Sequence, residues 1–188
     1  GRGRESGGGG GGKEEVRAGE RIPSAAEPPL VVMLVGPPGS GKSTFSARLS
    51  EYFTIINQDT LGSRRACEHE MRLALAKRQP VVIDRCNFDP KQRGHFLAIA
   101  RDFRVPQGRI CALQLMVSID ECVKRVSKRT GHPTLQPGPK SEGVVRRFAH
   151  LMQPPRLSEG FGHVIGVNAG DDVMAAEFVA WTTGCTTG

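Results

Sequence analysis

The stretch "GPPGSGKST", residues 36–44, has the residue types and spacing of a loop that holds phosphate groups. It fits the pattern G-x-x-x-x-G-K-[ST] with Gly36, Gly41, Lys42 and Ser43 at the fixed positions. Glycines let backbone N–H groups surround phosphate oxygens, the lysine reaches the β and γ phosphates, and the hydroxyl ligates magnesium. We therefore predict a site for a nucleoside triphosphate and Mg²⁺, whose other nucleotide-binding residues are Pro37, Gly39, Ser40 and Thr44.

Two acids stand at the ends of apolar runs, where they could face this loop. Asp84 ends the run "PVVID", and Asp59 comes shortly after the run "FTII". In doubly wound sheets, ligands bind in the crevice outside the carboxyl ends of the strands. We predict that Asp84 is a metal ligand together with Ser43, a strand-end cap being its alternative role, and that Asp59 points into the crevice.

Three classes of protein carry such a loop: GTPase switches, motor or chaperone ATPases, and kinases. A GTPase needs the guanine-reading N-K-x-D, and the nearest stretch, "NAGD" at 168–171, lacks the lysine. A motor ATPase usually has a second acid after the strand-end acid, to activate water. Here Arg85, Cys86 and Asn87 follow Asp84, which favours a kinase.

The elements that must position these residues alternate along the chain. Short apolar runs without strict alternation indicate strands buried on both faces, as in a parallel sheet, at residues 30–35, 53–56, 80–84, 110–117 and 163–167. Helices are predicted between them, at residues 42–52, 64–77, 90–102, 119–128, 141–152 and 171–181. Asp89 before Pro90 reads as an N-cap, and "SIDE" at 118–121 reads as a capping box.

This succession predicts an α/β fold of the P-loop NTPase type. We expect a five-stranded parallel sheet in the order 2-3-1-4-5, flanked by helices and with a basic lid. Residues 1–28, which contain a glycine run at 7–12, are predicted to be a flexible tail, and residues 29–188 to form one domain. The "TGHPTLQPGPKSEG" stretch, residues 130–143, looks too irregular for a helix and is predicted to be a lid or acceptor-binding loop.

The composition indicates which partners and which cellular compartment to expect. The net charge of +7 favours a polyanionic partner or an anionic ligand. The five cysteines show no CxxC spacing, which favours a reduced, intracellular protein. No apolar run is long enough to span a membrane, so we expect no membrane contact. We expect a monomer in the cytoplasm or, given the basic charge, in the nucleus. Because residue 1 is Gly rather than Met, we expect that a longer native chain carries further domains.

Four blocks resemble the polynucleotide 5′-hydroxyl kinase family over about residues 30–130: "GPPGSGKSTF", "NQDTLGS", "VVIDRCNFDPKQR" and "VKRVSKR". Two further blocks, "KRTGHPTLQPGPKSEGVVRRF" and "PPRLSEGF", resemble the amino-terminal kinase-like module of plant and fungal aprataxin-related proteins and extend the likeness to about residue 167. Neither a D-x-D-G-T acid pair of a phosphatase nor an H-x-H-x-H of a histidine-triad hydrolase is present in this sequence.

The resemblance implies roles for particular residues. Asp59 takes the position of the general base on the acceptor hydroxyl, and Gln58 stands where the family usually has an arginine. Asp84 and Asn87 match the family's acid-x-x-Asn. Arg125 and Arg129, four residues apart on one predicted helix, take the positions of lid arginines that contact the donor phosphates. The catalytic residues implied are Asp59, Lys42 and Arg129.

Acceptor-binding residues are predicted around the base. Arg64 and Arg65 could hold the phosphate next to the acceptor hydroxyl, or could simply lie on a helix surface. Asn87 and Phe88 are further candidates; aromatic residues make up only 5% of the chain, so base stacking is limited to candidates such as Phe88. Residues 124–147 contain seven basic residues and the single acid Glu142, so a phosphate backbone could lie along them.

These observations predict an ATP- and Mg²⁺-dependent kinase that phosphorylates the 5′-hydroxyl of DNA or RNA ends in nucleic-acid repair or processing. One alternative is a small-metabolite kinase on the same fold, whose acceptor pocket would be compact rather than an open basic channel. The other is a nucleotide-gated nucleic-acid-binding module without transfer activity, which the Gln58 departure favours. The choice between DNA and RNA, and between ATP and GTP, stays open at the level of sequence.

Overall fold

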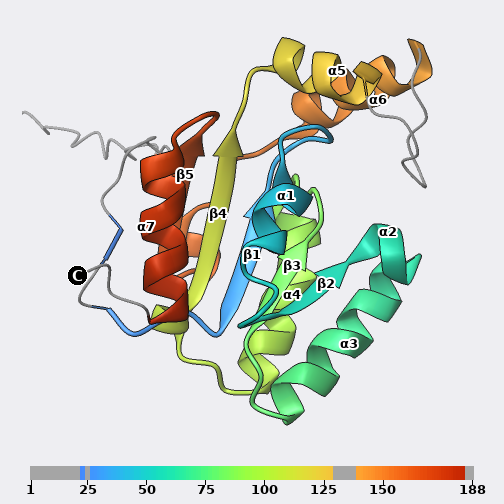
Figure 1. The fold of residues 1–188 in the computed structure, drawn as a ribbon. Coiled ribbons are helices and arrows are strands. Elements are labelled where there is room, and N and C mark those ends of the chain that lie inside the picture. The colour runs from blue at the N-terminus through green and yellow to red at the C-terminus, as the bar shows by residue number, and fades with distance from the viewer. Residues whose placement is uncertain (1–21, 24–25, 129–138, 185–188) are drawn as a thin grey trace, which may run out of the picture.

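The computed structural model of the protein describes residues 22–23, 26–128 and 139–184. Its centre is a five-stranded sheet in the order β2-β3-β1-β4-β5, in which every neighbouring pair is parallel. The strands are β1 (Val31–Val35), β2 (Thr54–Asn57), β3 (Val81–Asp84), β4 (Ile110–Met116) and β5 (His163–Asn168) (Figure 1). The predicted fold class and strand order are therefore confirmed.

Seven α-helices are present in the described part of the chain. They are α1 (Lys42–Ala47), α2 (Gln58–Leu61), α3 (Arg64–Ala76), α4 (Pro90–Asp102), α5 (Ile119–Lys128), α6 (Pro139–Leu151) and α7 (Asp172–Thr183). Two short 3₁₀ helices, η1 (Gln107–Arg109) and η2 (Leu157–Glu159), lie in connections. The Asp89 side chain accepts the backbone N–H of Gln92 at 2.7 Å, as its predicted N-cap role requires.

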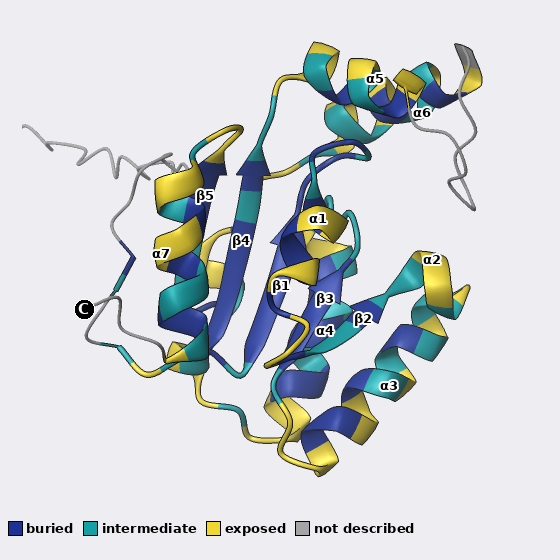
Figure 2. Ribbon diagram, in the orientation of Figure 1, coloured by how far each residue is buried: buried dark blue, intermediate teal, exposed yellow. Residues whose placement is uncertain are grey.

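Helices cover both faces of the sheet because successive side chains of a strand point to opposite sides. In β1, Val31 and Met33 pack into one apolar cluster with α3 and α4, while Val32 and Leu34 pack into a second cluster with α1 and α7. All five residues of β1 and all four of β3 are buried, which Figure 2 shows as dark strands between the helices. The continuous apolar runs in the sequence reflect this burial on both faces.

Three local predictions differ from the structure. Helix α1 ends at Ala47 rather than at residue 52, because the chain continues in turns with i to i−3 bonds such as Leu49 N–H to the Ser46 carbonyl, 2.9 Å. The short helix α2 was not predicted. The stretch 130–143 is not wholly irregular, because α6 begins at Pro139, and proline is well tolerated in a first helical turn.

The packed part of the chain begins before residue 29. Ile22 is 7% exposed and belongs to the apolar cluster under α7. The indole Nε1 of Trp181 donates to the carbonyl of Ala26 at 3.1 Å, and the Nε of Arg109 donates to the carbonyl of Pro28 at 2.9 Å. Three described residues of the predicted tail, Ile22, Ala26 and Pro28, therefore contact the domain.

Helices α5 and α6 form a separate pair above the carboxyl edge of the sheet (Figure 1). Cys122 and Val126 of α5 pack against Val145 of α6. This α5–α6 pair also touches the phosphate-binding loop closely, because a Cβ added to Gly39 would lie 2.5 Å from the carbonyl oxygen of Cys122. None of the helices in the described part of the chain is long and apolar enough to cross a membrane.

Candidate active site

The phosphate-binding loop runs from the end of β1 into α1, as its sequence pattern requires. Gly41 precedes α1 with φ 97°, in the left-handed region that favours glycine. The Gly36 N–H donates to the carbonyl of Cys86 at 3.2 Å, which ties the loop to the segment after β3. Lys42 is buried, and its Nζ donates to the carbonyls of Gly36 (2.8 Å) and Pro37 (2.9 Å). The ammonium group therefore lies within the curve of the loop, where phosphate oxygens bind in this motif.

Asp84 ends β3 beside this loop and is almost fully buried, at 4% exposed. Its Oδ2 accepts from Ser46 Oγ at 3.0 Å and from Asn57 Nδ2 at 2.8 Å. Asn57 is the residue opposite Asp84 in the parallel pairing of β2 with β3. The carboxylate of Asp84 is thus held in one orientation by two neutral donors from the elements on either side, α1 and β2.

Asn57 also determines where Asp59 lies. Its Oδ1 accepts the backbone N–H groups of Asp59 (2.8 Å) and Thr60 (3.2 Å), so that Asn57 is the N-cap of α2. Asp59 is consequently in the first turn of a helix, two residues past the end of β2, and it is solvent-exposed. Sequence reasoning did not assign a role to Asn57; an asparagine directly before a polar turn was the available signal.

Gln58, the residue before Asp59, is contacted by an arginine from elsewhere in the chain. The Nε of Arg85, which follows β3, donates to Gln58 Oε1 at 2.5 Å. The guanidinium lies over the ring of Phe96, 5.3 Å from its centroid, and burial there lowers the Arg85 pKa. Its Nη1 is buried and has no hydrogen-bond partner among the described residues. An arginine that follows the neighbouring strand therefore contacts Gln58, which stands where polynucleotide 5′-hydroxyl kinases usually have an arginine.

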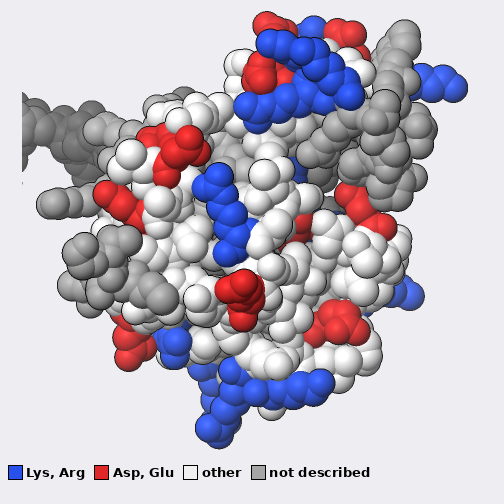
Figure 3. Space-filling view, viewed as in Figure 1, with Lys and Arg blue, Asp and Glu red and all other residues white. Residues whose placement is uncertain are grey.

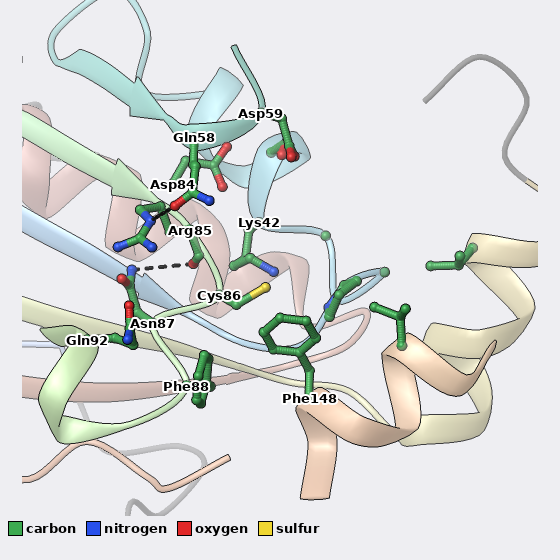
Figure 4. Close-up of a pocket in the computed structure, with 16 residues that line it drawn as sticks. Lys42, Gln58, Asp59, Asp84, Arg85, Cys86, Asn87, Phe88, Gln92 and Phe148 are labelled. Atoms are coloured by element: carbon green, nitrogen blue, oxygen red, sulfur yellow. Dashed lines mark hydrogen bonds between the residues drawn. The ribbon is translucent and has the colours of Figure 1, made fainter. Parts of the chain in front are cut away.

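A cavity of about 290 Å³ brings these groups together (Figure 4). Its polar lining includes Lys42, Ser43, Asp59, Asp84 and Arg85, which come from the ends of three neighbouring strands. The predicted residues Asn87 and Phe88 line the same cavity. Parallel strands bring their carboxyl ends to one edge of a sheet, which explains how residues far apart in sequence meet here.

The Asn87–Phe88 segment is fixed by a buried arginine. Arg93 is fully buried, and it donates to both carboxylate oxygens of Glu159 at 2.8 and 2.7 Å. The same guanidinium donates to the carbonyls of Asn87 and Gln153, each at 2.9 Å. Arg93 therefore joins the loop after β3 to the segment that follows α6. The Phe88 ring meets Phe148 of α6 edge to face, with centroids 5.3 Å apart.

A second cavity, of about 560 Å³, lies on the other side of the phosphate-binding loop. It shares Gly39 and Gly41 with the first cavity and is also lined by Arg125, Lys128 and the loop of residues 168–172. The Nε of Arg125 donates to Glu121 Oε1 at 2.8 Å, and this bond lowers the Glu121 pKa. The Glu121 side chain therefore binds Arg125, and of the predicted capping box only the bond from the Glu121 N–H to Ser118 Oγ is present among the described residues.

Several predicted residues lie elsewhere. Arg64 is outside the lining of the first cavity, and it contacts Glu68 at 3.3 Å and the ring of His95. Arg65 is exposed on α3 and also outside that lining. Arg129 lies outside the described residues, so its predicted catalytic and phosphate-binding roles stay predictions.

The basic surface of the α5–α6 pair is more balanced than its sequence indicates. Figure 3 shows Lys and Arg side chains gathered over these helices, with acidic side chains among them. Arg146 pairs with Asp120 (3.7 Å) and with Glu142 (2.9 Å), and Lys124 pairs with Glu121 (3.8 Å). The fold thus brings acids from the start of α5 beside basic residues of the stretch 124–147.

The donor set at the loop fits magnesium. Ser43 and Asp84 offer oxygen ligands in one cavity, and Mg²⁺ is usually held by few protein oxygens, with water and substrate phosphates completing its octahedral shell. Within the described ranges, no group of three or more His, Cys, Asp or Glu side chains could hold a metal ion. A site that depends on nucleotide phosphates for its remaining ligands is therefore the kind that these residues support.

Comparison with known sequences gives a family and two partial relatives. A family model described as an AAA domain matches residues 31–155. Transcription factor bHLH140 of Arabidopsis thaliana is 32% identical over 153 residues, which cover 77% of this chain and 16% of that protein. A protein of Acanthamoeba polyphaga mimivirus, named as a bifunctional polynucleotide phosphatase/kinase, is 31% identical over 99 residues, covering 52% of this chain and 23% of that protein. This chain spans less than a quarter of either relative.

Solved structures share the fold. A fungal RNA kinase superposes with a TM-score of 0.60 at 22% identity, covering 84% of this chain and 85% of that chain. Kti12 of Chaetomium thermophilum, solved with ADP-AlF3, has a TM-score of 0.60 at 15% identity (84% and 100% covered). A gluconokinase of Sinorhizobium meliloti 1021 has a TM-score of 0.56 at 19% identity (85% and 92% covered). These likenesses show the fold of P-loop kinases.

Proposed function

The chain belongs to the AAA domain family, and on this premise we propose that it is a kinase that uses ATP and Mg²⁺ to phosphorylate the 5′-hydroxyl of DNA or RNA ends. One observation carries the proposal. A single cavity is lined by Lys42 of the phosphate-binding loop, by the buried acid Asp84 and by the exposed acid Asp59, which lies in α2. Phosphoryl transfer requires these groups, because the moving charge must be neutralised and the attacking hydroxyl aligned and deprotonated.

In this proposal each cavity binds one of the two substrates, ATP and the acceptor. The phosphates of ATP bind along residues 36–44 and Lys42, and its nucleoside part extends into the larger cavity, towards Arg125 and the loop of residues 168–172. The acceptor enters the smaller cavity, where Asp59 stands at the rim. Because Gly39 and Gly41 line both cavities, the γ-phosphate lies at the point where donor and acceptor meet.

The transfer step uses Asp59 as the base. The 5′-oxygen of the acceptor forms a bond to the γ-phosphorus while the bond from that phosphorus to the β–γ bridging oxygen breaks, and ADP leaves. The hydroxyl proton passes to the Asp59 carboxylate. A positioned base of this kind accelerates a reaction by roughly 10²- to 10⁴-fold. When bound to Ser43, Asp84 and the phosphates, magnesium would neutralise charge on the β and γ phosphates.

Transfer to an acceptor is better supported than hydrolysis by water. In the cavity, Asp84 is followed by Arg85, whose Nε is engaged with Gln58, and not by a second acid that could activate water. The mimivirus relative carries polynucleotide kinase in its name, and the fungal structure is that of an RNA kinase. Both support a nucleic-acid end as the acceptor.

A small-metabolite kinase is the second candidate, and the size of the acceptor cavity favours it. At about 290 Å³ this cavity is compact, near the lower end of the ~300–1,000 Å³ usual for ligand pockets. The gluconokinase shows that the same fold serves a small polar acceptor. Ion pairs also reduce the free positive charge of the α5–α6 pair, which an open nucleic-acid channel would need.

One assay separates the candidates. The protein is incubated with γ-labelled ATP and either a 5′-hydroxyl oligonucleotide of DNA or RNA, or a panel of sugars and sugar acids. We expect label on oligonucleotide ends, and we expect Asp59→Asn to lower the rate roughly 10²- to 10⁴-fold. The matched control is Asp102→Asn, which removes an exposed carboxylate from the end of α4. Label on sugars alone would overturn the proposal, and so would oligonucleotide binding without any transfer.

A further inference from the structure

Two phenylalanines from different elements build one end of the acceptor cavity. Phe88 follows β3 and Phe148 lies in α6, and their rings meet edge to face at an interplanar angle of 78°. Both side chains are only half-buried, so neither ring is enclosed by the core. Figure 4 shows the two rings at one end of the cavity, with Gln58 and Asp59 at the other end and Lys42 between them.

The surroundings of the rings are apolar as well. Val126 of α5, Val144 of α6 and Pro38 of the phosphate-binding loop line the same cavity. Hydroxyl groups of a sugar lose hydrogen bonds with water on entering such a lining, at a cost in free energy. A flat aromatic group gains from it, and nucleobases stack on aromatic side chains irrespective of their sequence. This end of the cavity therefore suits a base better than a polyol.

Asn87, the residue before Phe88, has one side-chain atom that lacks a hydrogen-bond donor. Asn87 is 2% exposed, and its Nδ2 donates to the carbonyl of Leu34 at 2.8 Å. Its Oδ1 is buried and has no hydrogen-bond partner in the described part of the chain. A buried acceptor without a partner is costly, and Asn87 is among the residues that line this cavity. Apolar pockets with a few fixed polar groups are typical of small-molecule sites.

We propose that Phe88 and Phe148 form the binding platform for the nucleobase of the terminal acceptor nucleotide. This inference rests on the proposed function, and it names the part of the substrate that the compact cavity recognises. One nucleotide enters, with its base against the two rings and its 5′-hydroxyl towards Asp59, while the remaining chain stays outside. The compact cavity then binds one terminal nucleotide of the acceptor and not a free sugar.

The protein side of the test replaces the rings by another apolar side chain. Phe88→Leu and Phe148→Leu are expected to raise KM for a 5′-hydroxyl oligonucleotide about 5- to 100-fold, as loss of one base–aromatic stack would. KM for ATP is expected to stay within about twofold, because neither ring lines the larger cavity. Phe103→Leu, on a half-exposed ring at the end of α4, is the matched control. Unchanged oligonucleotide KM in both variants would overturn the platform.

The substrate side of the test leaves the fold untouched. An oligonucleotide of the same sequence, but without the base of its 5′-terminal residue, is expected to show a similar rise in KM with the wild-type protein. With Phe148→Leu, removal of the base should then cause little further loss, because the two changes delete the same contact. If the full loss recurs in Phe148→Leu, or if the wild type ignores the missing base, the base binds elsewhere and the platform is wrong.

The outcomes distinguish a failure of the proposed kinase function from a failure of the Phe88–Phe148 platform. Transfer to normal oligonucleotides without any effect of ring or base leaves the proposed function standing and overturns the platform. Absence of transfer to every oligonucleotide, with transfer to a sugar, overturns the proposed function and the platform with it. Circular dichroism of each variant establishes that a change in KM does not come from unfolding.

Discussion

Asn57 and Asp84 form a hydrogen bond of 2.8 Å, Nδ2 to Oδ2, across the parallel pairing of β2 and β3. The same amide caps α2 and so places Asp59. One side chain thereby helps to position both the candidate metal ligand and the candidate base.

Removal of the Asn57 side chain should lower both stability and activity. Asn57→Ala deletes an N-cap worth about 0.5–2 kcal/mol and a donor to a buried carboxylate, so we expect the free energy of unfolding to fall by about 2–4 kcal/mol. Asn57→Ser keeps a side chain that can cap the helix and deletes the amide donor to Asp84, and its stability should fall between that of Asn57→Ala and wild type. Urea unfolding measures this order. Equal stability of Asn57→Ser and Asn57→Ala would mean that the cap contributes nothing.

Asp84→Asn should change the response to magnesium. The substitution keeps the shape of the side chain but removes the charge that attracts the cation. We expect the Mg²⁺ concentration for half-maximal activity to rise at least about tenfold, measured by titration at saturating ATP. Asp102→Asn serves again as the control on an exposed acid. An unchanged Mg²⁺ titration would exclude Asp84 as a ligand and leave it as a strand-end cap.

Arg85 and Gln58 should be exchangeable as a pair. Arg85→Gln removes the cation that contacts Gln58, and we expect kcat/KM to fall about tenfold or more, since a hydrogen bond to a charged group contributes about 1.5–3 kcal/mol. The double variant Gln58→Arg with Arg85→Gln restores one arginine and one amide at the same place. We expect it to recover most of the lost rate. A double variant as slow as the product of the two single effects would show that the pair does not act as a unit.

Substitution of the buried Arg93 should lower the free energy of unfolding more than substitution of an exposed arginine. Arg93→Ala leaves Glu159 and two carbonyls without their buried partner, and breaking a buried ion pair costs about 3–5 kcal/mol. Arg72→Ala is the matched control, because its pair with Asp102 is exposed and worth about 1 kcal/mol or less. Thermal or urea unfolding compares the two. A loss no larger for Arg93 than for Arg72 would contradict the anchoring role.

Cysteine modification should report on the acceptor cavity. Burial raises the pKa of the Cys67, Cys111 and Cys122 thiols, so they should resist alkylation in the folded protein. Cys86 is half-buried and lines the cavity. In a Cys185→Ser background we expect iodoacetamide to label Cys86 first, and a bound 5′-hydroxyl oligonucleotide to slow the labelling. Mass spectrometry locates the adduct, and faster labelling of Cys111 would contradict the order.

The fold class and the place of the phosphate-binding loop were predictable from the sequence through short-range rules: apolar runs buried on both faces make parallel strands, and a glycine-rich loop between strand and helix fits phosphate. The strand order was predicted as that of the P-loop NTPase fold, and the structure has it. The sequence also brought Asp84, Asn87 and Phe88 to the correct edge, because residues at the carboxyl ends of parallel strands share that edge.

Which side chains meet at this edge depends on tertiary packing. Phe148 contacts Phe88 from α6, Arg85 contacts Gln58 from the end of the neighbouring strand, and Arg64 contacts Glu68 and His95 and does not line the cavity. These contacts depend on side-chain directions and on the packing of elements far apart in the chain, and no local pattern contains that information. The physical reason is that spacing along a chain fixes the face of an element, whereas packing fixes the neighbour that the face meets.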